Sequence, residues 1–424
     1  MDVLEERKKR LHGLIDLARV SRGWSRAQLG RALGRDATKI YPESGNPKAD
    51  FLIRLAEVLE WSVGDVIDSV WGTDRGEFEP VGTTEAQPLT YRQLYDQARA
   101  AHQRGDWRRV VDLGRRMFDA ADTPELRAIA CISESVGWDG LGRYMQEVEA
   151  AQRGLREHPV SIVTRNMLRA ALANAWYSLW DLTPALGTAE VLVKWYEANP
   201  PERRLDWKRV AYVHYVRGNT LRRLATEEPD LKETHYRNAA RDLARASELY
   251  TELSREFNDI SLAGIANTCK GAIIEVETEL GLRDPGEAVS ELIAGVLKVD
   301  DAQEELRGDW LESYGWWATF ACDIALRHLS GRELQTALRV LNQKGLDIAD
   351  RLGNWAMRER VFTLQFSLHR AISDSAGLDV PYTVPPESRS LIAATMGRFP
   401  SFRSTGWEIL NSARIVEPRE EVHS

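Results

Sequence analysis

The chain has 424 residues, more than one compact hydrophobic core usually holds, so we expect at least two domains. Hydrophobic residues make up 43% and charged residues 28%, which excludes an intrinsically disordered protein. The formal net charge of -8 excludes a protein that coats nucleic acid over its whole surface. The N-terminal segment differs from the rest, because residues 1–48 hold eleven basic and six acidic residues. We therefore expect a contact with a polyanion in this segment alone.

The three cysteines lie far apart, at Cys131, Cys269 and Cys322, and none belongs to a CxxC pair. This spacing favours reduced thiols in a cytoplasmic protein over a disulfide framework. The basic N-terminus lacks the apolar stretch of a signal peptide, and no apolar run approaches the roughly 20 residues that cross a bilayer. We expect a cytoplasmic protein with no membrane partner.

Five short amphipathic helices are predicted before residue 71. Ser25 and Gln28 form the pattern of a capping box at the start of the second helix, and Gly34 supplies its C-cap. Asp36 is the predicted N-cap of the third helix. The turn at residues 43–47 leads to the last two. In order, the predicted helices contain residues 11–18, 26–33, 37–40, 51–59 and 63–67.

The string RGWSRAQLGRALG at residues 22–34 resembles the signature of the Cro/cI (XRE) helix-turn-helix family. Asn46-Pro47, residues 52–59 and residues 62–66 resemble the segments that follow in that family, and they occur in the same order. The similarity covers about residues 11–70. It implies a five-helix, lambda-repressor-like domain that binds double-stranded DNA with its third helix in the major groove.

This resemblance also implies roles for individual residues. Arg26, at the start of the second helix, would contact phosphate, while Arg35, Thr38 and Lys39 would face the bases. The chain departs from the family between Gly34 and Asn46, where it has about three residues fewer. Pro42 disfavours helical geometry at the residue before it, so the third helix is expected to be short. Either this helix reads few bases, or the domain has been kept for another purpose.

Beyond a linker predicted at residues 72–90, almost every segment has helical periodicity. Helix–turn–helix patterns recur at roughly forty to fifty residues, a longer period than the ~34 residues of the tetratricopeptide repeat. The segment at residues 91–372 nevertheless resembles degenerate tetratricopeptide repeats, as in regulators that sense peptides. Such repeats form an α-solenoid whose inner wall suits an extended ligand. The recurring patterns lie at residues 95–107, 173–186, 212–225, 265–280 and 316–329.

Three asparagines occupy similar places in successive inner helices: Asn174, Asn219 and Asn267. An asparagine side chain both donates and accepts hydrogen bonds, so it can pair with a peptide backbone of any sequence. The resemblance to peptide-sensing regulators implies that role here. Ordinary hydrogen bonding between helices remains an equal alternative. The neighbours expected to shape side-chain pockets are Tyr177, Tyr215, Arg222, Lys270 and Trp317.

No phosphate-binding loop, zinc-protease motif or nucleophile elbow occurs, and the eight histidines do not cluster. We therefore predict a protein that is not an enzyme and needs no cofactor or metal. The predicted fold is all-α, with a helix-turn-helix domain at residues 1–71 and an α-solenoid. Residues 373–424 are expected to form a loop, helices that cap the solenoid, and a polar tail.

These observations favour a sequence-specific transcription regulator. It would bind DNA as a homodimer and hold a peptide or protein ligand in its repeat domain. Two alternatives remain open. One is a protein-interaction scaffold whose degenerate helix-turn-helix does not read DNA. The other is a phage- or plasmid-type repressor whose repeats dimerise without a ligand.

Overall fold

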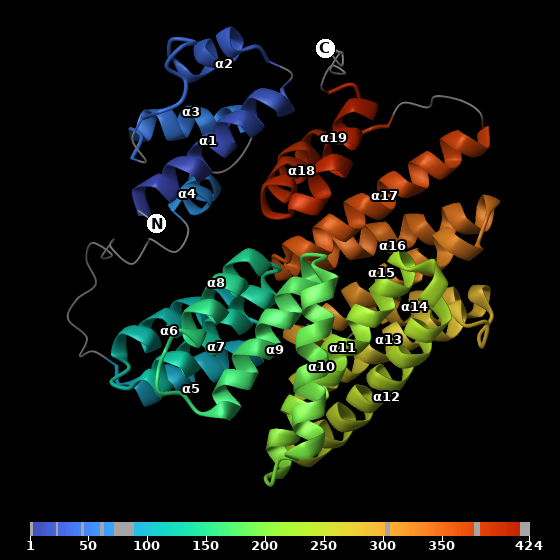
Figure 1. Cartoon of the computed structure of the whole chain (residues 1–424). Helices are drawn as coiled ribbons and strands as arrows, with labels where there is room; N and C mark the ends of the chain where they lie inside the picture. The colour runs from blue at the N-terminus through green and yellow to red at the C-terminus, as the bar shows by residue number, and fades with distance from the viewer. Residues whose placement is uncertain are drawn as a thin grey trace. The chain divides into compact units, whose positions relative to one another are not determined.

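A computed structural model describes residues 3–22, 24–43, 46–59, 63–71, 89–301, 306–376 and 382–415. All regular secondary structure in these ranges is helical, which confirms the predicted all-α class (Figure 1). No helix in these ranges combines the length and apolar character needed to span a bilayer. The chain divides into two compact units, residues 88–368 and residues 1–87 together with 369–424.

Four helices form the N-terminal part of the first unit: α1 (Val3–Ser21), α2 (Arg26–Leu33), α3 (Ala49–Leu59) and α4 (Val63–Trp71). The predicted capping box is confirmed, since the backbone N of Ser25 donates to Gln28 Oε1 at 2.8 Å and the backbone N of Gln28 donates to Ser25 Oγ at 3.3 Å. Gly34 ends α2 in the left-handed conformation, with φ 65°, as the sequence predicts.

The predicted third helix does not form. Between α2 and α3 the residues from Asp36 to Lys39 make a single turn instead. The Asp36 carboxylate accepts hydrogen bonds from the backbone N of Thr38 at 2.8 Å and from its hydroxyl at 2.6 Å. Such local bonding competes with helix formation, and Pro42 prevents the turn from continuing as a helix. The helix-turn-helix therefore lacks the helix that the family resemblance places in the major groove.

Long-range contacts hold this loop against α1. The Tyr41 hydroxyl donates to Asp16 Oδ1 at 2.6 Å, and His12 Nε2 donates to the Pro42 carbonyl at 2.8 Å. Ile40 is 1% exposed and anchors the loop in the core of the domain. These contacts replace the packing that an amphipathic third helix would supply.

The first unit also contains C-terminal helices, namely α18 (Pro386–Arg398), η4 (Pro400–Phe402) and α19 (Arg403–Ser412). Helix α18 contacts α1, and the backbone N of Tyr382 donates to the Ser412 carbonyl at 3.2 Å. This grouping differs from the predicted role of residues 373–424 as a cap on the solenoid. The predicted polar tail at 417–424 lies outside the described residues.

The second unit consists of consecutive helical hairpins followed by one long helix. Side-chain caps start several helices, for example Thr90 and Thr123. The elements are α5 (Tyr91–Gln103), α6 (Trp107–Ala120), α7 (Pro124–Gly140), α8 (Tyr144–Leu155), α9 (Ile162–Ser178), α10 (Leu182–Ala198), η2 (Arg204–Asp206), α11 (Trp207–Glu227), η3 (Pro229–Leu231), α12 (Lys232–Phe257), α13 (Ile260–Glu279), α14 (Pro285–Asp301), α15 (Gly308–His328), α16 (Gly331–Leu352) and α17 (Trp355–Ala376).

The odd-numbered helices of this unit form its inner wall. Helix α7 contacts α9, α9 contacts α11, α11 contacts α13, and α13 contacts α15. Each also packs on the even-numbered helix that follows it in the chain. We call α7, α9, α11, α13, α15 and α17 the inner helices. Their side chains provide most of the lining of the candidate site.

The first two hairpins of this unit touch its last hairpin and α17. The backbone N of Trp355 donates to the Leu141 carbonyl at 3.2 Å, across 214 residues of sequence. A Cβ atom on Gly105 would lie 2.5 Å from the backbone N of Gly308, so the α5–α6 turn and the start of α15 meet backbone to backbone. We call these contacts the seam. Because the seam joins the two ends of the array, the inner helices enclose a space instead of lining an open groove.

Candidate functional site

Two adjoining hollows lie between the inner helices. The larger has a volume of about 560 Å³ and the smaller about 350 Å³, including their open sides. Arg223, Trp316, Phe320 and Arg360 line both, so the two hollows share one wall. We refer to the two together as the central hollow.

One end of the central hollow is acidic. Asp139 accepts a hydrogen bond from Asn174 Nδ2 at 2.9 Å, and Glu312 accepts one from Trp316 Nε1 at 3.0 Å. Glu147, whose Oε2 has no hydrogen-bond partner, lies near Asp139. Among the described residues, no basic side chain lies within 4.0 Å of these three carboxyl groups. This end therefore has acidic groups without counter-charges.

Burial controls the protonation of these acids, because a low-dielectric environment disfavours the charged form. The pKa of Asp139 is raised to about 7: burial is the largest cause, the Asn174 bond opposes it, and nearby Asp309 adds to it. Burial also raises the pKa of Glu147 and of Glu312 well above the usual range, and Asp139 adds to both shifts. Near neutral pH, Asp139 is thus the member of the group that is ready to ionise.

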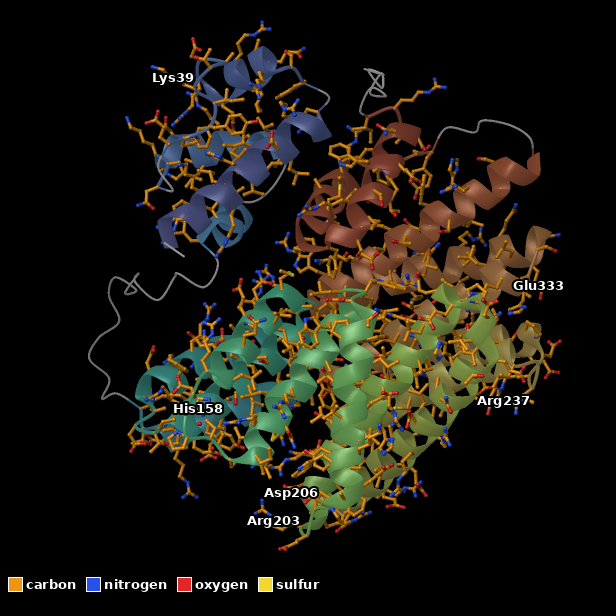
Figure 2. The ribbon with its side chains drawn as sticks, viewed as in Figure 1. Lys39, His158, Arg203, Asp206, Arg237 and Glu333 are labelled. Atoms are coloured by element: carbon orange, nitrogen blue, oxygen red, sulfur yellow. The ribbon has the colours of Figure 1, made fainter. Side chains whose placement is uncertain are left out.

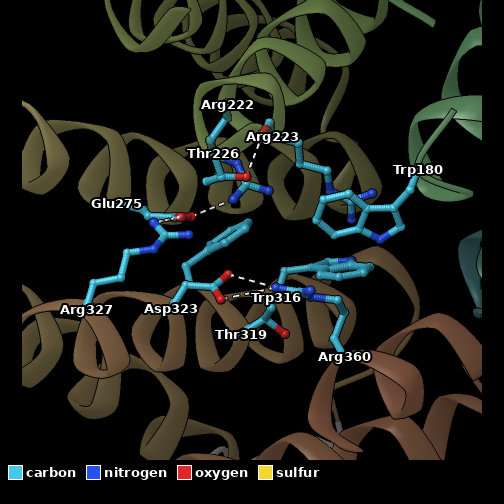
Figure 3. A pocket seen from close by; sticks show the side chains of 11 residues that line it. Trp180, Arg222, Arg223, Thr226, Glu275, Trp316, Thr319, Asp323, Arg327 and Arg360 are labelled. Atoms are coloured by element: carbon cyan, nitrogen blue, oxygen red, sulfur yellow. Dashed lines mark hydrogen bonds and ion pairs between the residues drawn. The ribbon is translucent and has the colours of Figure 1, made fainter. Parts of the chain in front are cut away.

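The other end is basic (Figure 3). Arg222 Nη1 donates to Glu275 at 2.6 Å, and Arg360 Nη2 contacts both Asp323 oxygens at 3.1 Å. Arg327 also pairs with Glu275, at 3.3 Å. Four arginines and two carboxylates line this hollow, and two further carboxyl groups adjoin them: Glu279 pairs with Arg327 at 3.1 Å, and Glu359 lies near Arg360 and Arg223.

Arg223 makes no ion pair at contact distance, although nearby Glu359 favours its charged form. Its side chain is 93% buried, since 7% of the residue is exposed, and no described carboxylate lies within 4.0 Å of its guanidinium. It donates to the Tyr177 carbonyl at 2.5 Å and lies 3.9 Å from the Tyr177 ring centre and 4.4 Å from that of Trp180. Burial lowers the pKa of Arg223, and nearby Arg360 and Arg222 act in the same direction. Two aromatic faces and one carbonyl hold this cation.

Several predicted ligand residues meet at this site. Asn174, Tyr177, Tyr215 and Asn219 line the larger hollow, and Arg222 lines the smaller one. The asparagine amides also make internal bonds: Asn174 bonds to Asp139 of α7, while Asn219 Nδ2 donates to the Tyr215 carbonyl of its own helix at 3.0 Å. The ordinary structural role thus accounts for part of their bonding capacity. Their predicted ligand role stays a prediction.

Asn267, Lys270 and Trp317 lie elsewhere. Asn267 Nδ2 donates to Ser313 Oγ at 2.8 Å between α13 and α15, and Lys270 is exposed. Trp317 Nε1 donates to the Asn267 carbonyl at 2.7 Å, and its ring packs against glycines of α13 and α14. These three residues are not among those that line the central hollow. The similar spacing of the three asparagines in the sequence did not predict that Asn267 lies outside the hollow. Each helix is rotated differently about its own axis relative to its neighbours, so equivalent positions face different surroundings.

The residues that dominate the charge of the hollow were missed by the sequence reasoning. A partial signal existed for α15, where Glu312, Trp316 and Phe320 recur every four residues and so lie on one helix face. Arg223 directly follows the predicted Arg222, but nothing in the sequence shows which of the two lacks a carboxylate. The missed residues are Asp139, Trp180, Arg223, Glu312, Trp316, Asp323 and Arg360.

The predicted DNA-binding residues lie on the N-terminal domain. Arg26 and Lys39 are exposed, at the start of α2 and in the loop after it, and Figure 2 shows Lys39 at the surface. Thr38 is exposed too, but its hydroxyl donates to Asp36. The Arg35 guanidinium lies 4.5 Å from the Phe51 ring centre. The expectation that Arg35, Thr38 and Lys39 lie around the start of a third helix is therefore corrected, because all three belong to the loop.

No group of three or more His, Cys, Asp or Glu residues within the described ranges is arranged to hold a metal ion. No family model and no curated protein matches the chain. Among solved structures, the chain is similar to Bacillus thuringiensis PlcR, in a crystal structure with the peptide PapR7 and DNA. The identity is 16% and the TM-score 0.38, over 73% of this chain and 98% of that one.

Proposed function

We propose that this protein is a ligand-responsive regulator that binds double-stranded DNA with its N-terminal domain. The observation that carries the proposal is the combination within one chain of a basic helix-turn-helix-like domain and an enclosed, charged hollow. Exposed cations on the first attract phosphate, and the second offers buried charges to a small ligand. Homodimerisation belongs to the same proposal, because paired heads would match two half-sites on DNA.

The short loop in place of the third helix sets the expected mode of DNA binding. Exposed cations such as Arg26 and Lys39 contact phosphates from outside the groove, so most of the binding free energy comes from counterion release. We expect affinity to fall steeply with salt. Discrimination between sequences is expected to be weaker than that of a domain with a full recognition helix.

The test is a titration of DNA from upstream of the protein's own gene at several salt concentrations. The Arg26→Ala/Lys39→Ala double variant should bind more weakly and lower the slope of log affinity against log salt by about two. The matched control is Arg203→Ala/Arg237→Ala, which removes two exposed cations from the repeat domain (Figure 2). An unchanged slope in the first variant, or an equal loss in the control, would contradict the proposed DNA surface.

A protein-interaction scaffold is the second candidate, and the absence of the third helix from the described loop favours it. In that case the N-terminal domain serves only as a packing module. The scaffold hypothesis predicts that the protein does not bind duplex DNA even at about 50 mM salt, where electrostatic binding is strong. Light scattering on the same samples measures the molecular mass and so tests whether the protein is a homodimer.

A further inference from the structure

The C-terminal helices α18 and α19 belong to a basic segment of the chain. Residues 386–415 hold four arginines and two glutamates, a net charge of +2, whereas the whole chain has a net charge of -8. One of the two glutamates, Glu408, pairs with Arg370 of α17 at 3.2 Å. Among the described residues, neither Arg389 nor Arg414 has a carboxylate within 4.0 Å. These two arginines therefore carry a charge that no described side chain offsets at contact distance.

The surroundings of the two arginines favour a bound anion. Arg414 is exposed, so its guanidinium is open to solvent. Arg389 is half-buried, and its Nε is buried without a hydrogen-bond partner. A buried donor without an acceptor costs free energy, most of all when it belongs to a charged group. An anion at the outer nitrogens of Arg389 offsets this cost, and phosphate is an anion that arginine binds well.

Residues from both ends of the chain meet beside these arginines. Arg22, which follows α1, lines one small hollow together with Arg389 of α18. Ile415, the residue after Arg414, lines the same hollow. Arg22 Nε donates to a backbone carbonyl in the last turn of α3 at 2.7 Å, which fixes the position of this arginine. Arg26, at the start of α2, is only four positions further along the chain, so the C-terminal arginines adjoin the basic N-terminal segment.

The backbone of Arg414 has an unfavourable conformation for its residue type. Its φ is 53°, in the left-handed region that glycine adopts freely and that costs any other side chain free energy. The backbone N of Arg414 donates to the Asn411 carbonyl at 2.8 Å, and the backbone N of Ile415 donates to the Leu410 carbonyl at 3.0 Å. These two bonds form a Schellman motif at the end of α19, where glycine is the usual residue.

Two other helices of the chain end with glycine in this conformation. Gly34 ends α2 with φ 65°, and Gly353 ends α16 with φ 67°. Arg414 thus occupies a position that glycine would occupy with less strain. Residues in strained conformations are concentrated at functional sites. The exposed positive charge is the property that glycine would not supply there.

We propose that α18 and α19 extend the DNA-contacting surface of the N-terminal domain, with Arg389 and Arg414 bound to phosphates beside Arg22. This inference rests on the proposed function, and it adds a segment from the other end of the chain to the surface that binds DNA. Phosphate contacts position a protein on the duplex without reading its sequence. They supply binding free energy to a domain in which a loop replaces the third helix.

The test is a titration of the full-length protein with two duplexes of unrelated sequence, each about three helical turns long, at several salt concentrations. The Arg389→Gln/Arg414→Gln variant should bind both duplexes more weakly and lower the slope of log affinity against log salt by about two. The control Arg203→Gln/Arg237→Gln removes two exposed arginines from the repeat domain and should keep the wild-type slope. An unchanged slope in the first variant, or an equal fall in the control, overturns the proposal.

Arg414→Gly separates a phosphate contact from a purely structural role. Glycine relieves the left-handed strain, so the melting temperature should rise, while the slope should fall by about one because a phosphate contact is lost. Arg414→Lys keeps the positive charge and should keep the wild-type slope. A wild-type slope in Arg414→Gly, or an equal fall in Arg414→Lys, overturns the assignment of Arg414 to a phosphate.

The same titrations distinguish this inference from the proposed function. If the slope falls in Arg26→Ala/Lys39→Ala but not in Arg389→Gln/Arg414→Gln, the C-terminal contact is rejected and the proposed function stands. If the slope falls only in Arg389→Gln/Arg414→Gln, the C-terminal contact is supported and the role of Arg26 and Lys39 is rejected. A wild-type protein that binds neither duplex at about 50 mM salt, where electrostatic binding is strong, rejects both.

Discussion

The surroundings of Asp139 make the charge on one wall of the hollow depend on pH. Its carboxyl group lies at the end of α7, bonded to Asn174, with no basic side chain of the described residues within 4.0 Å. Burial raises the pKa of Asp139 to about 7, whereas an aspartate in an unfolded chain titrates near 3.9. The folded protein therefore holds this proton over a range of pH in which the unfolded chain has released it.

The sign of the pH dependence follows from that difference. The neutral form stabilises the fold fully below about pH 4, and the contribution is lost as pH rises through about 7. We expect the melting temperature of the wild type to fall between pH 5 and pH 8. Asp139→Asn keeps a neutral group that still accepts the Asn174 bond, so its melting temperature should fall less over this range. Thermal unfolding at intervals of one pH unit measures both slopes.

Asp96→Asn is the control, because Asp96 is an exposed acid of α5 in the same domain. Its slope should match that of the wild type. If Asp139→Asn also matches the wild type, the raised pKa of Asp139 does not contribute to stability.

At the level of elements, glycines determine how closely the inner helices approach. A Cβ atom on Gly264 of α13 would lie 2.5 Å from the backbone carbon of Asp309 in α15. Gly271 and Gly295 similarly leave room for the Trp317 ring. Because α13 and α15 line the same hollow, their separation sets its width.

Gly264→Ala tests this packing. The added methyl group must displace helix backbone, so we expect a loss of about 1–3 kcal/mol in the free energy of unfolding. Gly187→Ala in α10 is the matched control, since no atom lies within 4 Å of the added Cβ there. That change should stabilise the protein by about 0.5–1 kcal/mol, because alanine favours the helix. Urea unfolding distinguishes the two signs, and a neutral Gly264→Ala would mean that α15 moves freely.

Helical periodicity and capping residues in the sequence predicted the all-α class and local features such as the Ser25–Gln28 capping box. The prediction of a third helix at residues 37–40 was wrong, because contacts between residues distant in sequence hold this segment in a loop. These contacts include Tyr41 with Asp16 and His12 with the Pro42 carbonyl. The candidate site was predicted only in part. Asn174 and Asn219 reach the hollow, but the unpaired charge of Arg223 depends on which carboxylates the other helices bring near it, and no local pattern encodes that.

At the scale of the whole repeat domain, the seam changes how the hairpins support one another. In an open array each repeat contacts only its neighbours, so stability is nearly a sum of local terms. Here Gly105 meets Gly308, and Leu141 bonds to Trp355, across more than two hundred residues. Loss of the seam should therefore weaken hairpins at both ends of the domain together.

Gly105→Ala tests the seam, with Gly281→Ala as a matched control. Both glycines have positive φ, 70° and 71°, so both changes carry a strain of about 1–2 kcal/mol. Only Gly105 has backbone atoms near the added Cβ, whereas nothing lies within 4 Å at Gly281. We expect Gly105→Ala to lose about 1–3 kcal/mol more in urea unfolding. Equal losses would show that the seam contributes little to stability.

The seam also has a consequence for the newly synthesised chain. A ribosome delivers domains from the N-terminus at about 5–20 residues per second, so the hairpin of α5 and α6 emerges many seconds before α17. Until Trp355 has left the ribosome, Leu141 has no partner for its carbonyl and the polar walls of α9 and α11 face water. A nascent chain therefore lacks the complete central hollow, and every molecule acquires it at one moment, when synthesis of the last inner helix is complete.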